Sequence, residues 1–289
     1  MAVSGGPDSL ALLLLAAAAR PGDVAAATVD HGLRAESAAE ASTVAQLCAA
    51  RGIPHDVLAV TVADGNLQAE ARSARYAALA AWAGQRGLAA LATAHHADDQ
   101  AETLLMRLNR GSGVAGLAGV RERAMVPGTT LPLIRPVLGW RRTELAEVVM
   151  AAGVTAADDP SNANDRFDRV RMRGHLATAD WLDVPALAAS AVHLADADAA
   201  LDWAARREWS ECVKAAPMGL TYRPQAPRAI ALRVLMLVVT KLDGEAPRGS
   251  AVARLFDALV AGKTASIGGL VARPANDGWN FMAAPKRRA

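Results

Sequence analysis

The sequence lacks the features that mark several large classes of protein. Only two of its 289 residues are cysteines, Cys48 and Cys212, and they lie far apart. This argues against a disulfide framework or a cysteine-bound metal cluster, and favours a reduced, cytoplasmic protein. The longest apolar run, residues 10–19, is roughly half the length of a bilayer span, and no basic segment precedes it. We therefore expect no membrane helix and no signal peptide.

Lysine is also scarce. It occurs only at positions 214, 241, 263 and 286, so no lysine side chain before Lys214 is available for catalysis. All other basic residues are arginines, which favour planar, two-point contacts with phosphates and can stack on bases. The formal net charge is only +2, and positive charge gathers locally at residues 166–173 and 286–288. These patches are compatible with a nucleic-acid partner, although solvated helix faces explain each patch taken alone equally well.

The first part of the chain alternates short β-like segments with helical ones. After a stub of strand at residues 1–3, we expect strands at 25–33, 55–62 and 88–96, separated by helices. This α/β alternation predicts a mainly parallel, Rossmann-like sheet that is covered on both faces. Polar clusters follow three of the strands, and ligands of such sheets bind at the carboxyl ends of the strands. The clusters should therefore meet at one edge; they read SGGPDS, DHGLR and HHADDQAET.

The pattern changes near residue 185. A long amphipathic helix begins there, followed by helices near 228–242 and 250–261 and by two short strands at 265–274 and 278–285. We therefore predict an α/β domain at residues 1–185 and a small, mostly helical domain at residues 186–289.

The stretch SGGPDS at residues 4–9 can bind phosphate where a strand turns into a helix. Gly5 and Gly6 allow positive φ and a close approach of the backbone, and Pro7 suits the first helical turn. Free N–H groups and the helix dipole then form an anion site. A kinase-type loop would end in Gly-Lys-Ser/Thr, whereas this loop carries Asp8, which makes sense among phosphates if it holds Mg²⁺. An ordinary strand-to-helix turn is the alternative.

SGGPDS resembles the pyrophosphate loop (PP-loop) of the N-type ATP pyrophosphatases, S-G-G-x-D-S. Further motifs follow in order: VDHGLR (29–34), NLQAEARSARY (66–76), AHHADDQAETLLMRLNRGSGVAGLAG (94–119), IRPVL (134–138) and DDPSNANDRFDRVRMR (158–173). Together they resemble the tRNA(Ile)-lysidine synthetase family over roughly residues 2–175, and the later region is similar to the small helical domain of that family.

This resemblance implies a ligase that acts on RNA. ATP adenylates the C2 carbonyl oxygen of the wobble cytidine in the CAU anticodon of tRNA(Ile), and the amine of free L-lysine then attacks C2 and displaces AMP to give lysidine. The resemblance further implies Mg²⁺ as cofactor, a cytoplasmic location and a homodimer through the long helix, with no membrane partner. The small domain would recognise the tRNA.

The resemblance also assigns roles to individual residues. Asp8 would hold Mg²⁺, while Asp30 and Arg110 would take part in catalysis. Asp99 and Glu102, which are three apart on one helix face, would bind the lysine ammonium group. The ATP and pyrophosphate ligands would be Ser4, Gly5, Gly6, Pro7, Asp8 and Ser9. The tRNA contacts would be Arg72, Arg75, Arg166, Arg169, Arg171 and Arg173.

Other interpretations of these residues remain open. Asp30 could simply cap a turn, Asp99 and Glu102 could complement a helix dipole, and His31 could be a turn residue. His95 and His96 beside acids could belong to a metal-dependent phosphohydrolase, although the other histidines are scattered.

Three rival functions differ in their requirements. A tRNA thiolase of the same superfamily would need paired cysteines, which this chain lacks. A non-catalytic tRNA-binding protein would not need the SGGPDS loop or the acidic DDQAET segment, so their presence argues against this alternative. An amide-forming ATP pyrophosphatase for a small metabolite would work without RNA.

Two departures from the family pattern are a first strand of only three residues before Ser4 and the pair Phe167-Asp168, where the family tends to show an arginine-asparagine pair.

Overall fold

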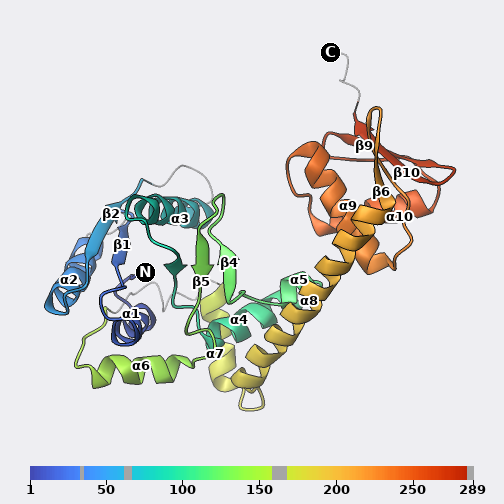
Figure 1. Ribbon diagram of the computed structural model, residues 1–289. Helices are drawn as coiled ribbons and strands as arrows, with labels where there is room; N and C mark the ends of the chain where they lie inside the picture. The colour runs from blue at the N-terminus through green and yellow to red at the C-terminus, as the bar shows by residue number, and fades with distance from the viewer. Residues whose placement is uncertain (33–35, 62–66, 158–167, 285–289) are drawn as a thin grey trace. The chain divides into compact units, whose positions relative to one another are not determined.

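The computed structural model describes residues 1–32, 36–61, 67–157 and 168–284 (Figure 1). The chain forms two compact units, Met1–Ala195 and Asp196–Ala289. The division falls inside helix α8 (Val184–Cys212), whose start coincides with the change of pattern predicted near residue 185.

A mainly parallel sheet forms the centre of the first unit. Strand β1 (Ala26–Asp30) pairs in parallel with β2 (His55–Ala59), and β3 (Leu91–Ala92) pairs in parallel with β5 (Pro132–Ile134). β4 (Arg123–Met125) is antiparallel to β5. Residues 1–3 lie between β1 and β3 and connect them. Val3 N donates to Ala27 O of β1 at 2.9 Å, and Ala2 N donates to Ala92 O of β3 at 3.0 Å. The short first strand is therefore hydrogen-bonded on both sides.

Helices cover both faces of this sheet, as predicted (Figure 1). Successive strand residues point to opposite faces, so Ala26 and Ala27 belong to different cores. Ala26 packs in a core with residues of α1 (Pro7–Ala19), α2 (Glu36–Ala50) and α6 (Arg142–Ala151). Ala27 packs in a second core with Tyr76, Leu79 and Trp82 of α3 (Leu67–Gln85).

The helix α4 (Ala97–Leu108) starts just after β3, at the edge where the polar clusters meet. Its buried Gln100 accepts from Val120 N at 2.6 Å and donates to Val120 O at 2.8 Å. A Cβ at Gly119, which has a φ of 61°, would lie 2.3 Å from the same side chain. Glycine is required there because both the conformation and the space exclude a side chain. The short α5 (Val114–Leu117) precedes this turn, and α7 (Asp168–Thr178) packs on α4.

The second unit combines two helices with an antiparallel sheet. The predicted helices are α9 (Arg228–Asp243) and α10 (Gly249–Val260). The sheet has the order β6-β7-β10-β9-β8. Its last strands fall in the segments predicted to be extended, whereas the hairpin of the first two was not predicted. The strands are β6 (Val213–Ala216), β7 (Gly219–Tyr222), β8 (Ala265–Ile267), β9 (Leu270–Ala275) and β10 (Gly278–Ala283).

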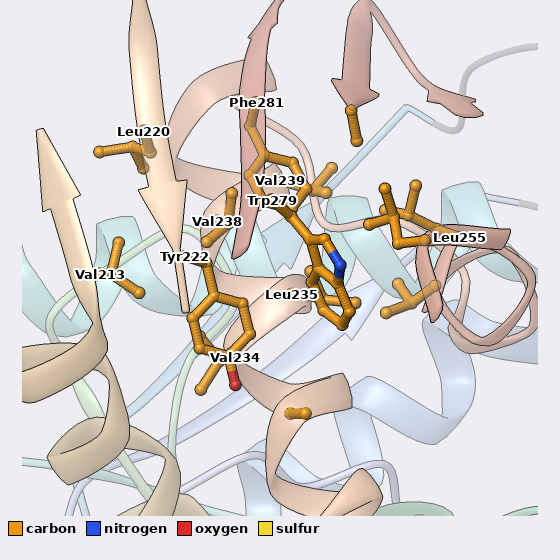
Figure 2. Close-up of a cluster of buried hydrophobic side chains, with 14 of the residues drawn as sticks. Val213, Leu220, Tyr222, Val234, Leu235, Val238, Val239, Leu255, Trp279 and Phe281 are labelled. Atoms are coloured by element: carbon orange, nitrogen blue, oxygen red, sulfur yellow. The ribbon is translucent and has the colours of Figure 1, made fainter. Parts of the chain in front are cut away.

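An aromatic cluster lies between this sheet and its helices (Figure 2). Trp279 makes edge-to-face contacts with Tyr222 and Phe256, with ring centroids 5.7 and 5.6 Å apart. Beside this core, the buried carboxylate of Glu208 accepts from Tyr222 Oη at 3.2 Å and from Gln225 N at 2.8 Å. Burial and the adjacent Glu208 charge raise the pKa of Tyr222 above its ordinary value.

Within the described residues, α8 is the one helix whose length and composition would allow it to cross a membrane. A single helix of this kind is weak evidence for a membrane span, and the second half of α8 carries Asp202, Arg206, Arg207 and Glu208.

Candidate active site

The SGGPDS loop, residues 4–9, has a shape fixed by its own residues. Gly5 has a φ of 88°, a conformation that L side chains rarely adopt. Gly6 and Pro7 begin α1, as the proline predicted. Ser9 Oγ donates to Gly6 O at 2.9 Å and accepts from Ser4 N at 3.2 Å. These hydrogen bonds order the loop that leads into α1. The free N–H groups in the first turn of α1 are therefore held in a fixed position, where they can bind an anion.

A cavity of about 550 Å³ opens beside this loop. Asp8 and Asp99 both line it, although they come from different helices. The edge of the sheet therefore brings together the phosphate loop and the acidic helix, as the positions of the clusters predicted. The predicted site residues that line the cavity are Ser4, Gly6, Pro7, Asp8, Ser9, Arg72, Arg75, Asp99, Arg169 and Arg173.

A buried histidine lies between the two acids. His96 is 2% exposed, and its Nε2 lies 3.4 Å from Asp8 Oδ2 and 3.6 Å from Asp99 Oδ2. Burial lowers the pKa of His96, but polar contacts with Asp8 and Asp98 and the charge of Asp99 outweigh it and raise the pKa to about 9. His96 is therefore a cation at neutral pH, and it offsets part of the acidic charge.

The neighbouring histidine, His95, is neutral rather than cationic at neutral pH. Burial, together with the charges of Arg135 and Arg169, lowers the pKa of His95 to about 4 despite the charge of Asp99. His95 Nδ1 lies 3.0 Å from Thr93 Oγ1. A neutral imidazole therefore lines the cavity next to a buried imidazolium.

Asp98 anchors the start of α6 to α4. It accepts from Arg142 N at 2.8 Å and from Arg141 Nη2 at 3.2 Å. Burial raises the pKa of Asp98, but contacts with His96 and Arg141 outweigh it and hold the pKa well below its ordinary value. The sequence suggested a role for His96 and Asp98 only as part of a metal-dependent phosphohydrolase, and none in lysidine synthesis. The sequence feature that could have identified them is their position in the polar cluster HHADDQAET, directly after a predicted strand and next to Asp99.

Glu102 does not reach the cavity surface. It is 1% exposed, and Arg169 Nε donates to its Oε2 at 3.0 Å while Arg173 Nε donates to its Oε1 at 2.9 Å. Arg169 also donates to Thr103 Oγ1 at 3.0 Å. Both arginines line the cavity, so Glu102 lies behind them, and its contact with lysine stays a prediction.

Gly5 is not among the residues that line the cavity, and four other predicted residues either do not line it or lie outside the described residues. Asp30 Oδ1 accepts from Gly32 N at 2.9 Å, which is the turn cap considered as its alternative role. Arg110 and Arg171 are exposed and pair with Asp168, at 2.7 and 2.5 Å respectively. Arg166 lies outside the described residues, as do Phe167 and the basic residues 286–288. His31, in contrast, lines the cavity.

The donor set at the loop is compatible with Mg²⁺. Asp8 Oδ1 is buried and has no hydrogen-bond partner within the described residues. These residues contain no group of three His, Cys, Asp or Glu side chains able to hold a metal ion. Mg²⁺ often uses only one or two carboxylates together with substrate phosphates, so Asp8 fits that role. Cys48 and Cys212 are each buried, in the cores of different units.

The comparisons with known proteins agree with this architecture. The PP-loop domain family matches residues 1–179. A U34-tRNA thiolase NcsA from Methanococcus maripaludis with its [4Fe-4S] cluster has a similar fold, with a TM-score of 0.56 and 18% identity over 67% of this chain and 69% of that chain. This chain has only two cysteines in its whole sequence, fewer than a cysteine-held cluster of this kind requires.

Sequence relatives are much closer. The tRNA(Ile)-lysidine synthase of Novosphingobium aromaticivorans is 51% identical over 100% of this chain and 90% of its own length. That of Zymomonas mobilis is 41% identical over 100% of this chain and 89% of its own length. The chain therefore belongs to the tRNA(Ile)-lysidine synthase family, within the PP-loop enzymes that use ATP.

Proposed function

We propose that this enzyme joins free L-lysine to C2 of the wobble cytidine in the CAU anticodon of tRNA(Ile), with ATP cleaved to AMP and pyrophosphate. The observation that carries the proposal is the shared cavity, in which the phosphate loop and Asp99 lie together. Membership of the family gives the same function, and the lone buried cysteines do not favour thiolation.

The first step is adenylation of the RNA. The C2 oxygen of cytidine attacks the α-phosphorus of ATP, and the bond to the β-phosphate oxygen breaks to release pyrophosphate. The N–H groups at the start of α1 and the hydroxyls of Ser4 and Ser9 would bind the leaving pyrophosphate. Asp8 would hold Mg²⁺, which neutralises phosphate charge when bound. Arg72 and Arg75 line the same cavity, where they could face nucleotide or RNA phosphates.

The second step forms the carbon–nitrogen bond. A neutral amine of lysine attacks C2, the C–O bond to AMP breaks, and the amine loses its proton. Adenylation makes this possible because it turns a poor leaving oxygen into a good one. Asp99 would receive an ammonium group of lysine, and the cavity would hold the amine close to C2.

The two domains would divide the work. The predicted domain 1–185 would carry out the chemistry, and the predicted domain 186–289 would recognise the tRNA, together with Arg166 and Arg171 near the start of α7. Catalytic roles for Asp30 and Arg110 remain predictions, since neither side chain lines the cavity. A homodimer through α8 remains a prediction too; the helix leaves Val192 and Trp203 exposed, and light scattering would measure the mass in solution.

One assay tests the main proposal. ATP, Mg²⁺, labelled lysine and tRNA(Ile) with a CAU anticodon are mixed, and the RNA is examined for label. The matched control is the same tRNA with the wobble cytidine replaced by uridine, which should take up no label. Release of pyrophosphate without any RNA would instead favour an amide-forming enzyme. The absence of pyrophosphate release under all conditions would favour a non-catalytic tRNA-binding protein.

A further inference from the structure

Within the described part of the second unit, helices pack on only one face of the five-stranded sheet. The buried side chains of the sheet point into the core shared with α9 and α10 (Figure 2), and they include Leu220, Tyr222, Trp279 and Phe281. Successive strand residues point to opposite faces, so the residues that alternate with these belong to the other face. Those residues are exposed or half-buried throughout. The second face of the sheet is therefore open to solvent.

One row of polar side chains crosses this open face. Lys214 of β6 lies opposite Thr221 of β7. Asn280 of β10 lies opposite Thr221 on one side and opposite Arg273 of β9 on the other. Neighbouring strands are about 4.8 Å apart, so a row across four strands extends for roughly 14 Å. The hairpins β6–β7 and β9–β10 thus place one cation at each end of a polar row.

The side chains of this row present hydrogen-bond donors. Thr221 Oγ1 donates to Asn280 Oδ1 at 2.7 Å, which occupies the amide oxygen and leaves the two N–H groups of the amide available. Within the described chain, the charged groups of Lys214 and Arg273 form no ion pair. The acid in the β9–β10 turn, Asp277, is already paired with Arg223 at 2.8 Å. The row therefore matches a partner that carries negative charge and hydrogen-bond acceptors, as a phosphate backbone does.

We propose that the row Lys214–Thr221–Asn280–Arg273 binds the phosphate backbone of the tRNA. This inference rests on the proposed function, in which a tRNA is the substrate. It gives the predicted RNA-binding domain a specific surface, on its sheet rather than on its helices. Contacts of this kind position an RNA without reading its sequence. The adjacent row begins with Ala216 and Gly219, whose small size leaves room for a backbone beside the donors.

The test measures binding of tRNA(Ile) to the full chain by filter retention, at several salt concentrations and without ATP or lysine. The double variant Lys214→Gln/Arg273→Gln should raise Kd roughly 10-fold or more, because two charge-assisted contacts are lost. The slope of log Kd against log salt concentration should fall by about 1 for each cation removed, since fewer counterions are released on binding.

The matched control is the double variant Arg254→Gln/Lys263→Gln. It removes the same two charges from exposed positions on α10 and in the turn that follows it, outside the row. Its Kd and salt slope should stay close to those of the wild type. Near-UV circular dichroism of the aromatic cluster should be the same in all variants, which shows that the second unit remains folded.

Asn280→Asp tests the middle of the row. It keeps the size of the side chain but replaces the amide donors with a carboxylate, which repels phosphate, so Kd should rise roughly 3- to 10-fold.

A Kd and a salt slope of Lys214→Gln/Arg273→Gln that equal those of the control variant would overturn the inference, and would favour an acidic protein as the partner of this face. The binding measurement does not depend on catalysis. A wild-type enzyme that binds tRNA through this row but transfers no lysine would therefore contradict the proposed function and still support the surface.

Discussion

Asp8 and Asp99 approach the same nitrogen atom, His96 Nε2, at 3.4 and 3.6 Å. Asp8 belongs to the phosphate loop at the start of α1, and Asp99 belongs to the first turn of α4. One buried cation therefore connects the proposed nucleotide and amino-acid sites. Because both acids line the same cavity, an adenylated nucleotide would not need to leave it before lysine attacks.

Replacing Asp8 should stop the first half-reaction. Asp8→Ala removes the buried oxygen that lacks a hydrogen-bond partner, and with it the proposed Mg²⁺ ligand. We expect the rate of tRNA-dependent pyrophosphate release to fall by at least about 100-fold, the effect typical of losing charge stabilisation in a transition state. Binding of tRNA, measured by filter retention, should remain. Unchanged pyrophosphate release in the variant would contradict the role of Asp8.

Replacing Asp99 should separate the two half-reactions. Asp99→Ala removes the acid proposed to bind a lysine ammonium group, whereas the phosphate loop keeps its residues. We expect KM for lysine to rise roughly 10-fold or more, as for the loss of a charged hydrogen bond, while pyrophosphate release changes much less. Single-turnover measurements of adenylation and of lysine transfer provide the comparison. Equal losses in both steps would remove Asp99 from the lysine site.

The neutral state of His95 predicts a pH dependence of stability. Its pKa of about 4 in the folded protein lies below the ordinary value of 6.5, so the unfolded chain binds more protons between these values. The stability that this histidine contributes is present above about pH 6.5 and is lost as pH falls towards 4, by up to about 1.4 kcal/mol per pH unit.

Urea unfolding between pH 7 and 4.5 would measure this dependence. His95→Gln should lose less stability on acidification than the wild-type protein does. His175→Gln, on an exposed position of α7, should behave like the wild type. Parallel curves for the wild type and His95→Gln would show that His95 titrates at its ordinary pKa.

The periodicity of the sequence was enough to predict most of the fold. The alternation of short apolar strands with helices predicted the order of elements up to α4. The polar clusters that follow the strands predicted that ligands bind at the carboxyl edge of the sheet. The hairpin β6–β7 was not predicted, and most residues of its first strand carry little β-signal of their own. Lys214, Ala215 and Ala216 are not strand formers, and the pairing of β7 with β10 decides their conformation.

The site was predicted in its parts but not in its contacts. Asp99 and Glu102 are three residues apart on α4 and were expected to share one face of the helix. In the structure Asp99 lines the cavity, whereas Glu102 is buried beneath it. Which acid is buried depends on α7, whose arginines come from more than sixty positions further along the chain. Likewise, one of the acids that raise the pKa of His96 is Asp8, which approaches it from a different helix. Contacts between distant segments cannot be read from local patterns.

The core of the second unit should depend on α9 residues according to the face they occupy. Leu235 is 0% exposed and packs in the core with Tyr222 and Trp279, whereas Leu237 on the same helix is 40% exposed. Leu235→Ala should lower the free energy of unfolding of this unit by about 2–5 kcal/mol, because it leaves a cavity as well as losing apolar contacts. Leu237→Ala removes the same atoms from a half-exposed position and should cost well under half as much. Urea unfolding followed by near-UV circular dichroism of the aromatic cluster measures both variants. Equal destabilisation would mean that α9 does not present Leu235 to this core, and the packing of α9 against the sheet would then be wrong.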